Sequence, residues 1–161
     1  MRSRPGNRAV FFNFASKMRL LGRILAIDYG NKRCGLAVTD PGQMIATPME
    51  TVPTHELMNY LKAYFEKEEV ELLVVGYPRQ MDNSESESMK QIRFFVGAFK
   101  KRFKEIPVEW MDERFTSSLA MDAMVTGGMR KSERKVKGNV DRVSAALILQ
   151  SFLEKRNNLQ A

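Results

Sequence analysis

The stretch from Arg23 to Asp40, RILAIDYGNKRCGLAVTD, constrains the fold more than any other part of the chain. It begins with four successive aliphatic residues, Ile24 to Ile27, and these are followed by an acid, Asp28. A continuous aliphatic run predicts a central strand that is covered on both faces. The residues after Asp28 predict a tight turn up to Arg33, and residues 34–39 predict a second strand that runs back. An acid at the end of a buried strand is costly unless it is solvated, paired or bound to a cation.

Two glycines, Gly30 and Gly35, follow Asp28 closely in this pattern. Because glycine has no side chain, another backbone or a phosphate can approach Asp28 at these positions. The stretch therefore predicts a buried strand that delivers an acid to an open edge of a sheet.

Three further strands are predicted along the chain. Residues 44–52 predict an edge strand because Pro48 interrupts them, and they complete an antiparallel meander. A helix that Thr54 can cap leads to the buried run 71–76, which is therefore expected to lie parallel to the first strand. Residues 106–111 predict the fifth strand. The expected fold is one α/β domain with a mixed five-stranded sheet, three antiparallel strands and then two parallel ones, flanked by helices.

Length and composition limit the chemistry. The 161 residues are enough for one domain with a real core, and no apolar run approaches the roughly 20 residues that span a bilayer. The single cysteine, Cys34, excludes an internal disulfide and fits a reducing cytoplasm. The single histidine, His55, argues against a histidine-based zinc site or a Ser-His-Asp triad. Carboxylates are therefore the groups left for catalysis.

The net charge of +7 points to a polyanionic partner, but it is unevenly distributed. Residues 1–17 contain four cations and no acid. We expect residues 1–21 to be a disordered or misannotated leader, residues 22–156 to be the folded domain, and residues 157–161 to be a tail. Residues 127–138 hold five Lys and Arg residues against one acid, and we expect a mobile basic loop that contacts phosphate.

Two loops follow the parallel strands. The loop from Gly76 to Ser84 lies where open α/β sheets place ligands, and Ser84 with Glu87 predicts a capping box at the start of a helix. Asp112 and Glu113 end the fifth strand, which we expect to neighbour the strand of Asp28. Adjacent residues of a strand point to opposite faces, so at most one of the two acids can face Asp28.

The last acid of interest, Asp141, begins the helix predicted for residues 140–156. It shares one helical stripe with Ala145, Ile148 and Phe152, which must face the sheet. We therefore expect Asp28, Asp141 and at least one of the acids at 112–113 to converge, with carboxylates within about 8 Å of one another.

Each of these acids also has a purely structural interpretation. The adjacent acids at 112–113 could be stabilised by the dipole of the following helix and by an ion pair with Arg114. Asp141 could simply favour a helix N-terminus, and Asp82 could be an ordinary turn residue.

Four stretches, in this order, carry a family resemblance. They are Asp28-x-Gly30-x-x-Arg33-x-Gly35-x-Ala37, the loop 76–84, Asp112-Glu113-Arg114 with Thr116-Ser117, and the segment 141–150. Together they resemble the YqgF/RuvX family, a branch of the RNase H-like nucleases, over residues 22–153. The loop departs from the family pattern, because Tyr77 stands in place of leucine and Asn83 in place of glycine.

The resemblance implies an RNase H-like fold and a nuclease that matures the precursor of the small-subunit (16S) ribosomal RNA. Acids without histidine partners favour hard cations, so we expect Mg²⁺ or Mn²⁺, as two ions roughly 4 Å apart. Asp28, Glu113 and Asp141 are the expected metal ligands, and Asp112 stays a fourth catalytic candidate. The expected phosphate-binding cations are Arg33, Arg79, Arg114, Arg130, Lys131, Arg134, Lys135 and Lys137.

Three alternatives remain at this stage. The family was formerly linked to Holliday junction resolution, so branched DNA is a second substrate. A non-catalytic RNA-binding module would keep the basic residues without using the acids. An actin-like ATPase would use the turn after Asp28 for phosphate, but it needs a duplicated domain that the sequence lacks. We expect a cytoplasmic monomer or homodimer with a nucleic-acid partner and no membrane association.

Overall fold

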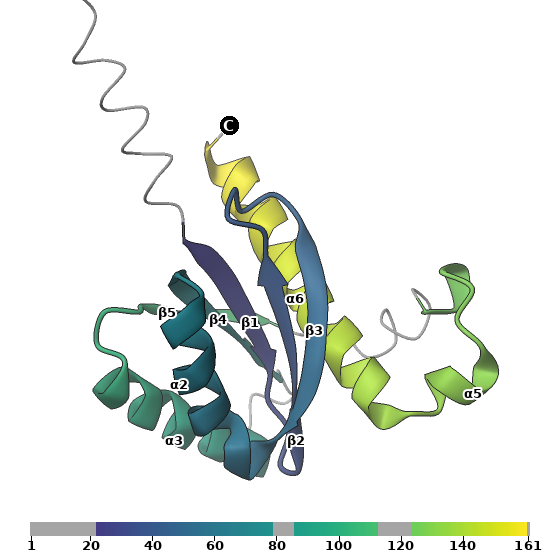
Figure 1. The fold of residues 1–161 in the computed structure, drawn as a ribbon, viewed down its shortest axis with the longest axis horizontal. Helices are drawn as coiled ribbons and strands as arrows, with labels where there is room; N and C mark the ends of the chain where they lie inside the picture. The colour runs from purple at the N-terminus through teal and green to yellow at the C-terminus, as the bar shows by residue number, and fades with distance from the viewer. Residues whose placement is uncertain (1–21, 79–85, 113–123, 161) are drawn as a thin grey trace, which may run out of the picture.

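The computed structural model describes residues 22–78, 86–112 and 124–160. They form a five-stranded sheet in the order β3-β2-β1-β4-β5, with helices on both faces (Figure 1). The strands are β1 (Arg23–Asp28), β2 (Arg33–Thr39), β3 (Ala46–Pro53), β4 (Val70–Tyr77) and β5 (Val108–Asp112). The helical elements are η1 (Thr54–Glu56), α2 (Leu57–Lys67), α3 (Glu87–Arg102), α5 (Lys131–Arg134) and α6 (Lys137–Gln160).

The strand directions agree with the expected mixed sheet. β2 pairs antiparallel with both β1 and β3, and β4 pairs parallel with both β1 and β5. β3 is an edge strand, as Pro48 predicts, because proline has no N–H to donate to a further strand. The prediction of a mixed α/β sheet with three antiparallel and two parallel strands is therefore confirmed.

One expected neighbour is wrong, because β5 does not lie beside β1. β4 separates them. The difference follows from hydrophobicity: Leu73, Val74 and Val75 of β4 are fully buried and need cover on both faces, whereas β5 has no fully buried residue and exposes Glu109. The more apolar strand takes the inner position, and β5 becomes the second edge.

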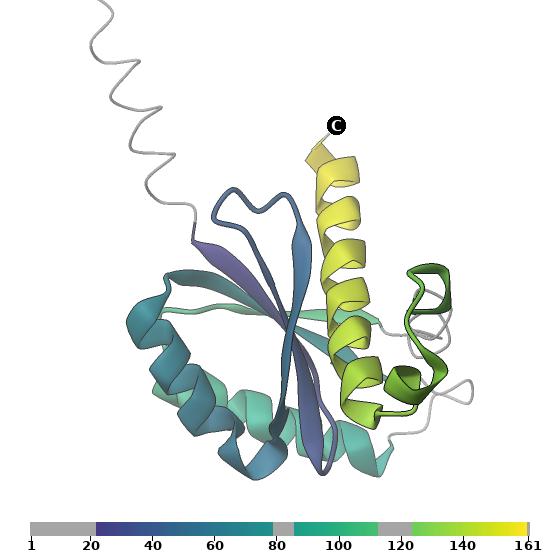
Figure 2. The ribbon, with the colours of Figure 1, turned by 45° about the vertical axis from the view of Figure 1, so that its right-hand side comes forward.

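Two apolar layers enclose the sheet, and β1 contributes to both. Leu25 and Ile27 pack with the buried faces of α2 and α3, whereas Ile24 and Ala26 pack with α6. Figure 2 shows α6 on one side of the sheet and α2 with α3 on the other. Each fully buried Leu or Ile of β1 contributes about 1.5–3 kcal/mol by leaving water. The position of each residue in β1 therefore decides the layer to which it belongs, and Asp28 follows Ile24 and Ala26 on the α6 side by alternation.

Helix α6 is longer than predicted at both ends, because it begins at Lys137 and continues through residues 157–160. The hydroxyl of Thr51 in β3 donates to the carbonyl oxygen of Gly138 at 2.6 Å, which holds the first turn against the sheet. Near the other end, Arg156 donates to the side-chain oxygen of Gln43 at 2.7 Å. Among the described helices, none is both long enough and apolar enough to cross a membrane.

Helix capping differs from the prediction in two places. Helix α3 begins at Glu87, and its cap is Ser86, whose hydroxyl accepts from the amide of Met89 at 3.2 Å; Ser84 lies outside the described residues. Thr54 does not cap α2, because it lies inside η1 and its hydroxyl donates to the carbonyl oxygen of Gly30. Thr54 therefore bonds to the turn after β1 and not to the helix that follows it.

The tightest contact between α6 and the sheet lies at Gly35 in β2. A methyl group at this position would overlap the carbonyl group of Asp141 and come within 2.7 Å of the amide nitrogen of Arg142. The helix backbone therefore rests directly on the strand backbone, which only glycine permits.

We expect Gly35→Ala to destabilise the protein by about 1–3 kcal/mol, because the added methyl must displace backbone rather than a flexible side chain. Gly97→Ala in α3 is the matched control, since a methyl there meets nothing within 4 Å. The control should stabilise the helix by about 1 kcal/mol. Urea denaturation of both variants measures the two effects, and equal midpoints would contradict the close contact.

Candidate active site

Asp28 is the last residue of β1 and lies on the face that α6 covers. It pairs with Gly35 of β2. Because Gly35 has no side chain and carries the backbone of Asp141, the pairing brings Asp28 and Asp141 to the same end of the sheet. Two residues far apart in the sequence are thus brought together by one strand pair and one close helix contact.

Asp141 is held by an ion pair with Arg33, the first residue of β2. The Nε–H group of Arg33 donates to Oδ2 of Asp141 at 2.5 Å, and both side chains are partly exposed. The predicted role of Arg33 in binding phosphate stays a prediction. The terminal amino groups of a guanidinium can donate to phosphate while Nε holds a carboxylate.

Both acids influence the buried thiol of Cys34. Its thiol is buried, and this burial is the main reason that its pKa is raised. Hydrogen bonds with Thr54 and Gly30 lower the pKa, whereas the negative charges of Asp28 and Asp141 raise it further. Of the causes that raise the pKa, burial is larger than either carboxylate.

The turn after Asp28 is fixed by a residue that sequence reasoning missed in this role. Thr54 accepts nothing from the helix that follows it; its hydroxyl donates to the carbonyl oxygen of Gly30 at 2.6 Å, and its amide donates to the carbonyl oxygen of Lys32 at 3.1 Å. Gly30 itself must be small, because a methyl there would collide with the carbonyl oxygen of Arg33. No local pattern identifies Thr54, because its position depends on the pairing of Arg33 with Pro53.

Asp112 does not join Asp28 and Asp141. It ends β5 and pairs with Tyr77, two strands away from β1. Trp110 packs in the layer of α2 and α3 and Met111 packs in the layer of α6. By alternation, Asp112 points to the α3 side of the sheet, opposite to Asp28.

The expected cluster of three acids is therefore not complete among the residues that are described. Within them, no group of three or more His, Cys, Asp or Glu side chains could hold a metal ion. Glu113, the expected third ligand, lies outside the described residues, as do Arg79 and Arg114. The only histidine in the chain, His55, has a side chain that is 80% exposed in η1, consistent with a surface role.

The basic stretch before α6 is more ordered than predicted. It contains α5, whose start is fixed because the amide of Arg130 donates to the carboxylate of Glu133 at 3.0 Å. The side-chain amide of Asn139 then donates to the carbonyl oxygen of Glu133 at 2.8 Å and links α5 to α6. The expectation of a loop is wrong because the one acid of the stretch stabilises a helical turn. Arg130, Lys131 and Lys135 remain exposed, and nothing is described for the side chain of Lys137.

Comparison with known proteins decides the family. Residues 22–155 match the family model described as "RuvX: Holliday junction resolvase". The chain belongs to the RuvX family. The resemblance expected from the four sequence motifs is therefore confirmed, and it covers the whole sheet together with most of α6.

Curated relatives of the RuvX chain are similar over nearly their full lengths. A protein of Phocaeicola vulgatus named "Putative pre-16S rRNA nuclease" is 54% identical over 136 residues, which cover 84% of this chain and 98% of that protein. A Porphyromonas gingivalis protein with the same name is 50% identical over 134 residues, covering 83% of this chain and 97% of that protein.

Solved structures support the fold of this RuvX chain. RuvC of Thermus thermophilus aligns with a TM-score of 0.50 and 17% identity, over 84% of this chain and 96% of that chain. The same protein in complex with a Holliday junction substrate aligns with a TM-score of 0.50 and 16% identity, over 83% and 96% of the two chains. These likenesses confirm the RNase H-like fold alone.

We expect Asp28→Asn and Asp141→Asn each to lower the pKa of Cys34, because each removes a negative charge that opposes the thiolate. The chain has one cysteine, so the Cβ chemical shift of labelled Cys34 can be followed through a pH titration without ambiguity. Glu109→Gln, which removes an exposed acid from β5, is the control and should leave the titration unchanged. A pKa that does not respond to either aspartate would contradict their shared position.

Proposed function

We propose that this RuvX protein is a metal-dependent nuclease that hydrolyses phosphodiester bonds of structured RNA in the maturation of the 16S rRNA precursor, in the cytoplasm. The proposal depends on one observation: the backbone of Asp141 contacts Gly35, and Gly35 is the strand partner of Asp28. Membership of the family and the name shared by relatives at 50–54% identity support the substrate. The charge of +7 suits a polyanion.

The acids at this end of the sheet fit a hard divalent cation, Mg²⁺ or Mn²⁺. Both described acids offer oxygen donors only, and the one histidine of the chain is on the surface. The ion pair with Arg33 stabilises the charged form of the Asp141 carboxylate. We assign Asp28, Glu113 and Asp141 as ligands, because Asp112 points to the opposite face.

A pair of such cations, when bound, supplies an activated water and neutralises charge on the leaving oxygen. The residues of the chain then have separate tasks. Asp28 and Asp141 hold the cations at the end of β1, and Gly30 with Gly35 keeps side chains away from them. Arg33, Arg79, Arg114 and the cations of residues 130–137 bind the phosphates of the substrate.

Branched DNA is the second candidate substrate, because the matching family model is described as a Holliday junction resolvase. A non-catalytic RNA-binding role is the third. Cleavage assays with structured RNA and with a four-way DNA junction, each with and without a divalent cation, separate the three functions. Binding without cleavage of either substrate would support the non-catalytic role.

We expect Asp28→Asn to reduce RNA cleavage by about 10²-fold or more, because it keeps the shape of the side chain but removes the charge that holds the cation. RNA affinity measured in chelator should hold or improve, since one repulsion against phosphate is lost. Stability without metal should rise for the same electrostatic reason. Glu154→Gln, an exposed acid of α6, is the control. Weaker binding together with lower stability would show that Asp28 is a structural residue.

We expect the triple change Lys131→Ala, Arg134→Ala and Lys135→Ala to weaken RNA binding. The slope of log affinity against log salt should fall by roughly one unit for each phosphate contact that is lost. Lys62→Ala, Lys67→Ala and Lys155→Ala remove the same charge from exposed positions on α2 and the last turns of α6. Binding titrations over a salt series test both triples, and an equal loss of slope would mean that only net charge matters.

A further inference from the structure

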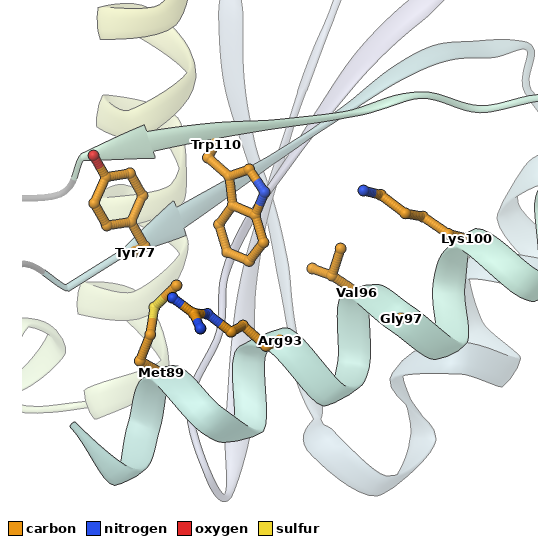
Figure 3. A pocket seen from close by; sticks show the side chains of 7 residues that line it. All are labelled: Tyr77, Met89, Arg93, Val96, Gly97, Lys100 and Trp110. Atoms are coloured by element: carbon orange, nitrogen blue, oxygen red, sulfur yellow. The ribbon is translucent and has the colours of Figure 1, made fainter. Parts of the chain in front are cut away.

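A second hollow lies at the same end of the sheet but on the other face, between α3 and the ends of β4 and β5. Its volume is about 540 Å³, within the range of small-ligand pockets. Figure 3 shows Tyr77 and Trp110 on the two strands facing Met89, Arg93 and Lys100 on α3. Val96 and Gly97 complete the lining.

The lining combines flat aromatic rings with positive charge. The rings of Tyr77 and Trp110 meet edge to face, with centroids 6.2 Å apart and an interplanar angle of 71°. Arg93 and Lys100 lie on exposed positions of α3, and no acid lies among the described residues of the lining. Aromatic faces that stack on bases, next to cations that meet phosphates, are the groups that bind single-stranded nucleic acid.

Strand pairing relates this hollow to the acids. Tyr77 pairs with Asp112, and Trp110 is two residues before it in β5. β4 lies directly beside β1, so β5 is two strand spacings, or about 10 Å, from the strand of Asp28. A nucleic-acid strand that reaches from one site to the other therefore crosses the carboxyl ends of β4 and β1.

We infer that this pocket binds an unpaired nucleotide of the RNA substrate, with its base stacked on Trp110 or Tyr77 and its phosphate beside Lys100. The inference rests on the proposed function for the identity of the nucleic acid. The pocket adds a specificity site to the proposed nuclease, because the substrate then needs an unpaired nucleotide beside the bond that is cleaved. Gly97 has no side chain, so the surface of α3 between Arg93 and Lys100 leaves room for a flat ring.

Trp110 gives a direct measurement, because it is the only tryptophan of the chain. A short unstructured RNA oligonucleotide, titrated into the full-length protein in chelator, should quench the indole fluorescence with a saturable curve. Tyr77→Leu should raise the dissociation constant by roughly tenfold, through loss of stacking. Lys100→Gln should raise it by about threefold or more and reduce the salt slope by about one unit.

The matched control is Lys101→Gln, which removes the same charge from the next, exposed position of α3 and is not part of the pocket. It should leave both the dissociation constant and the quenching unchanged. Thermal unfolding of Tyr77→Leu checks that the variant is folded, and Lys100→Gln tests the pocket without touching the core. Equal effects of Lys100→Gln and Lys101→Gln would overturn the inference.

The outcomes separate this inference from the proposed function. Cleavage of RNA without quenching of Trp110 would overturn the pocket and leave the nuclease intact. Quenching without cleavage would support the pocket and contradict the nuclease. An acidic peptide that quenches Trp110 where the oligonucleotide does not would show a protein partner instead, and would overturn the inference.

Discussion

The contact between Gly35 and the backbone of Asp141 is the constraint on which the rest of the structure depends. It sets how closely α6 approaches the sheet, and the apolar residues Ala145, Ile148 and Phe152 fill the space beneath the helix. The same contact places Asp141 beside the end of β1. The packing of one layer and the position of one acid therefore have a single cause, and a larger residue at position 35 disturbs both.

Two polar interactions hold this end of the sheet in place. Arg33 pairs with Asp141, and the Thr54 hydroxyl fixes the turn that follows Asp28. Because the Arg33 pair is partly exposed, solvent screens it, and its contribution to stability is modest. Its value lies in fixing the orientation of the carboxylate rather than in holding the fold together.

Much of the fold is predictable because it follows from periodicity. The apolar run of β1, the interruption by Pro48 and the stripe of α6 gave the strand directions and the face of Asp141 correctly. The order of β4 and β5 was not predictable from either strand alone, because it depends on which of them is better buried. Thr54 and Ser86 differ from prediction for a related reason, since a short polar side chain has several partners and the tertiary structure selects one.

In the candidate site, too, some positions are predictable from the sequence and others depend on the tertiary structure. The sequence identifies Asp28 and Asp141 through their positions on a strand and a helix stripe, and the structure places them at one end of the sheet. It separates Asp112 from them, because alternation in β5 turns that side chain to the other face. The pocket around Trp110 had no local signal, since it is assembled from two strands and a helix.

Pro48, inside β3, has a consequence for how the protein behaves at high concentration. A sheet edge with regularly spaced N–H and C=O groups is a template on which another chain can add a strand. Pro48 removes one donor from this edge, and the irregular pairing between Gly35 and Ala37 of β2 disturbs the regular spacing next to it. The exposed Met44 and Ile45 lie just before this strand, where an open edge would otherwise invite aggregation. The irregular edge is thus a poorer template for an added strand than an unbroken one.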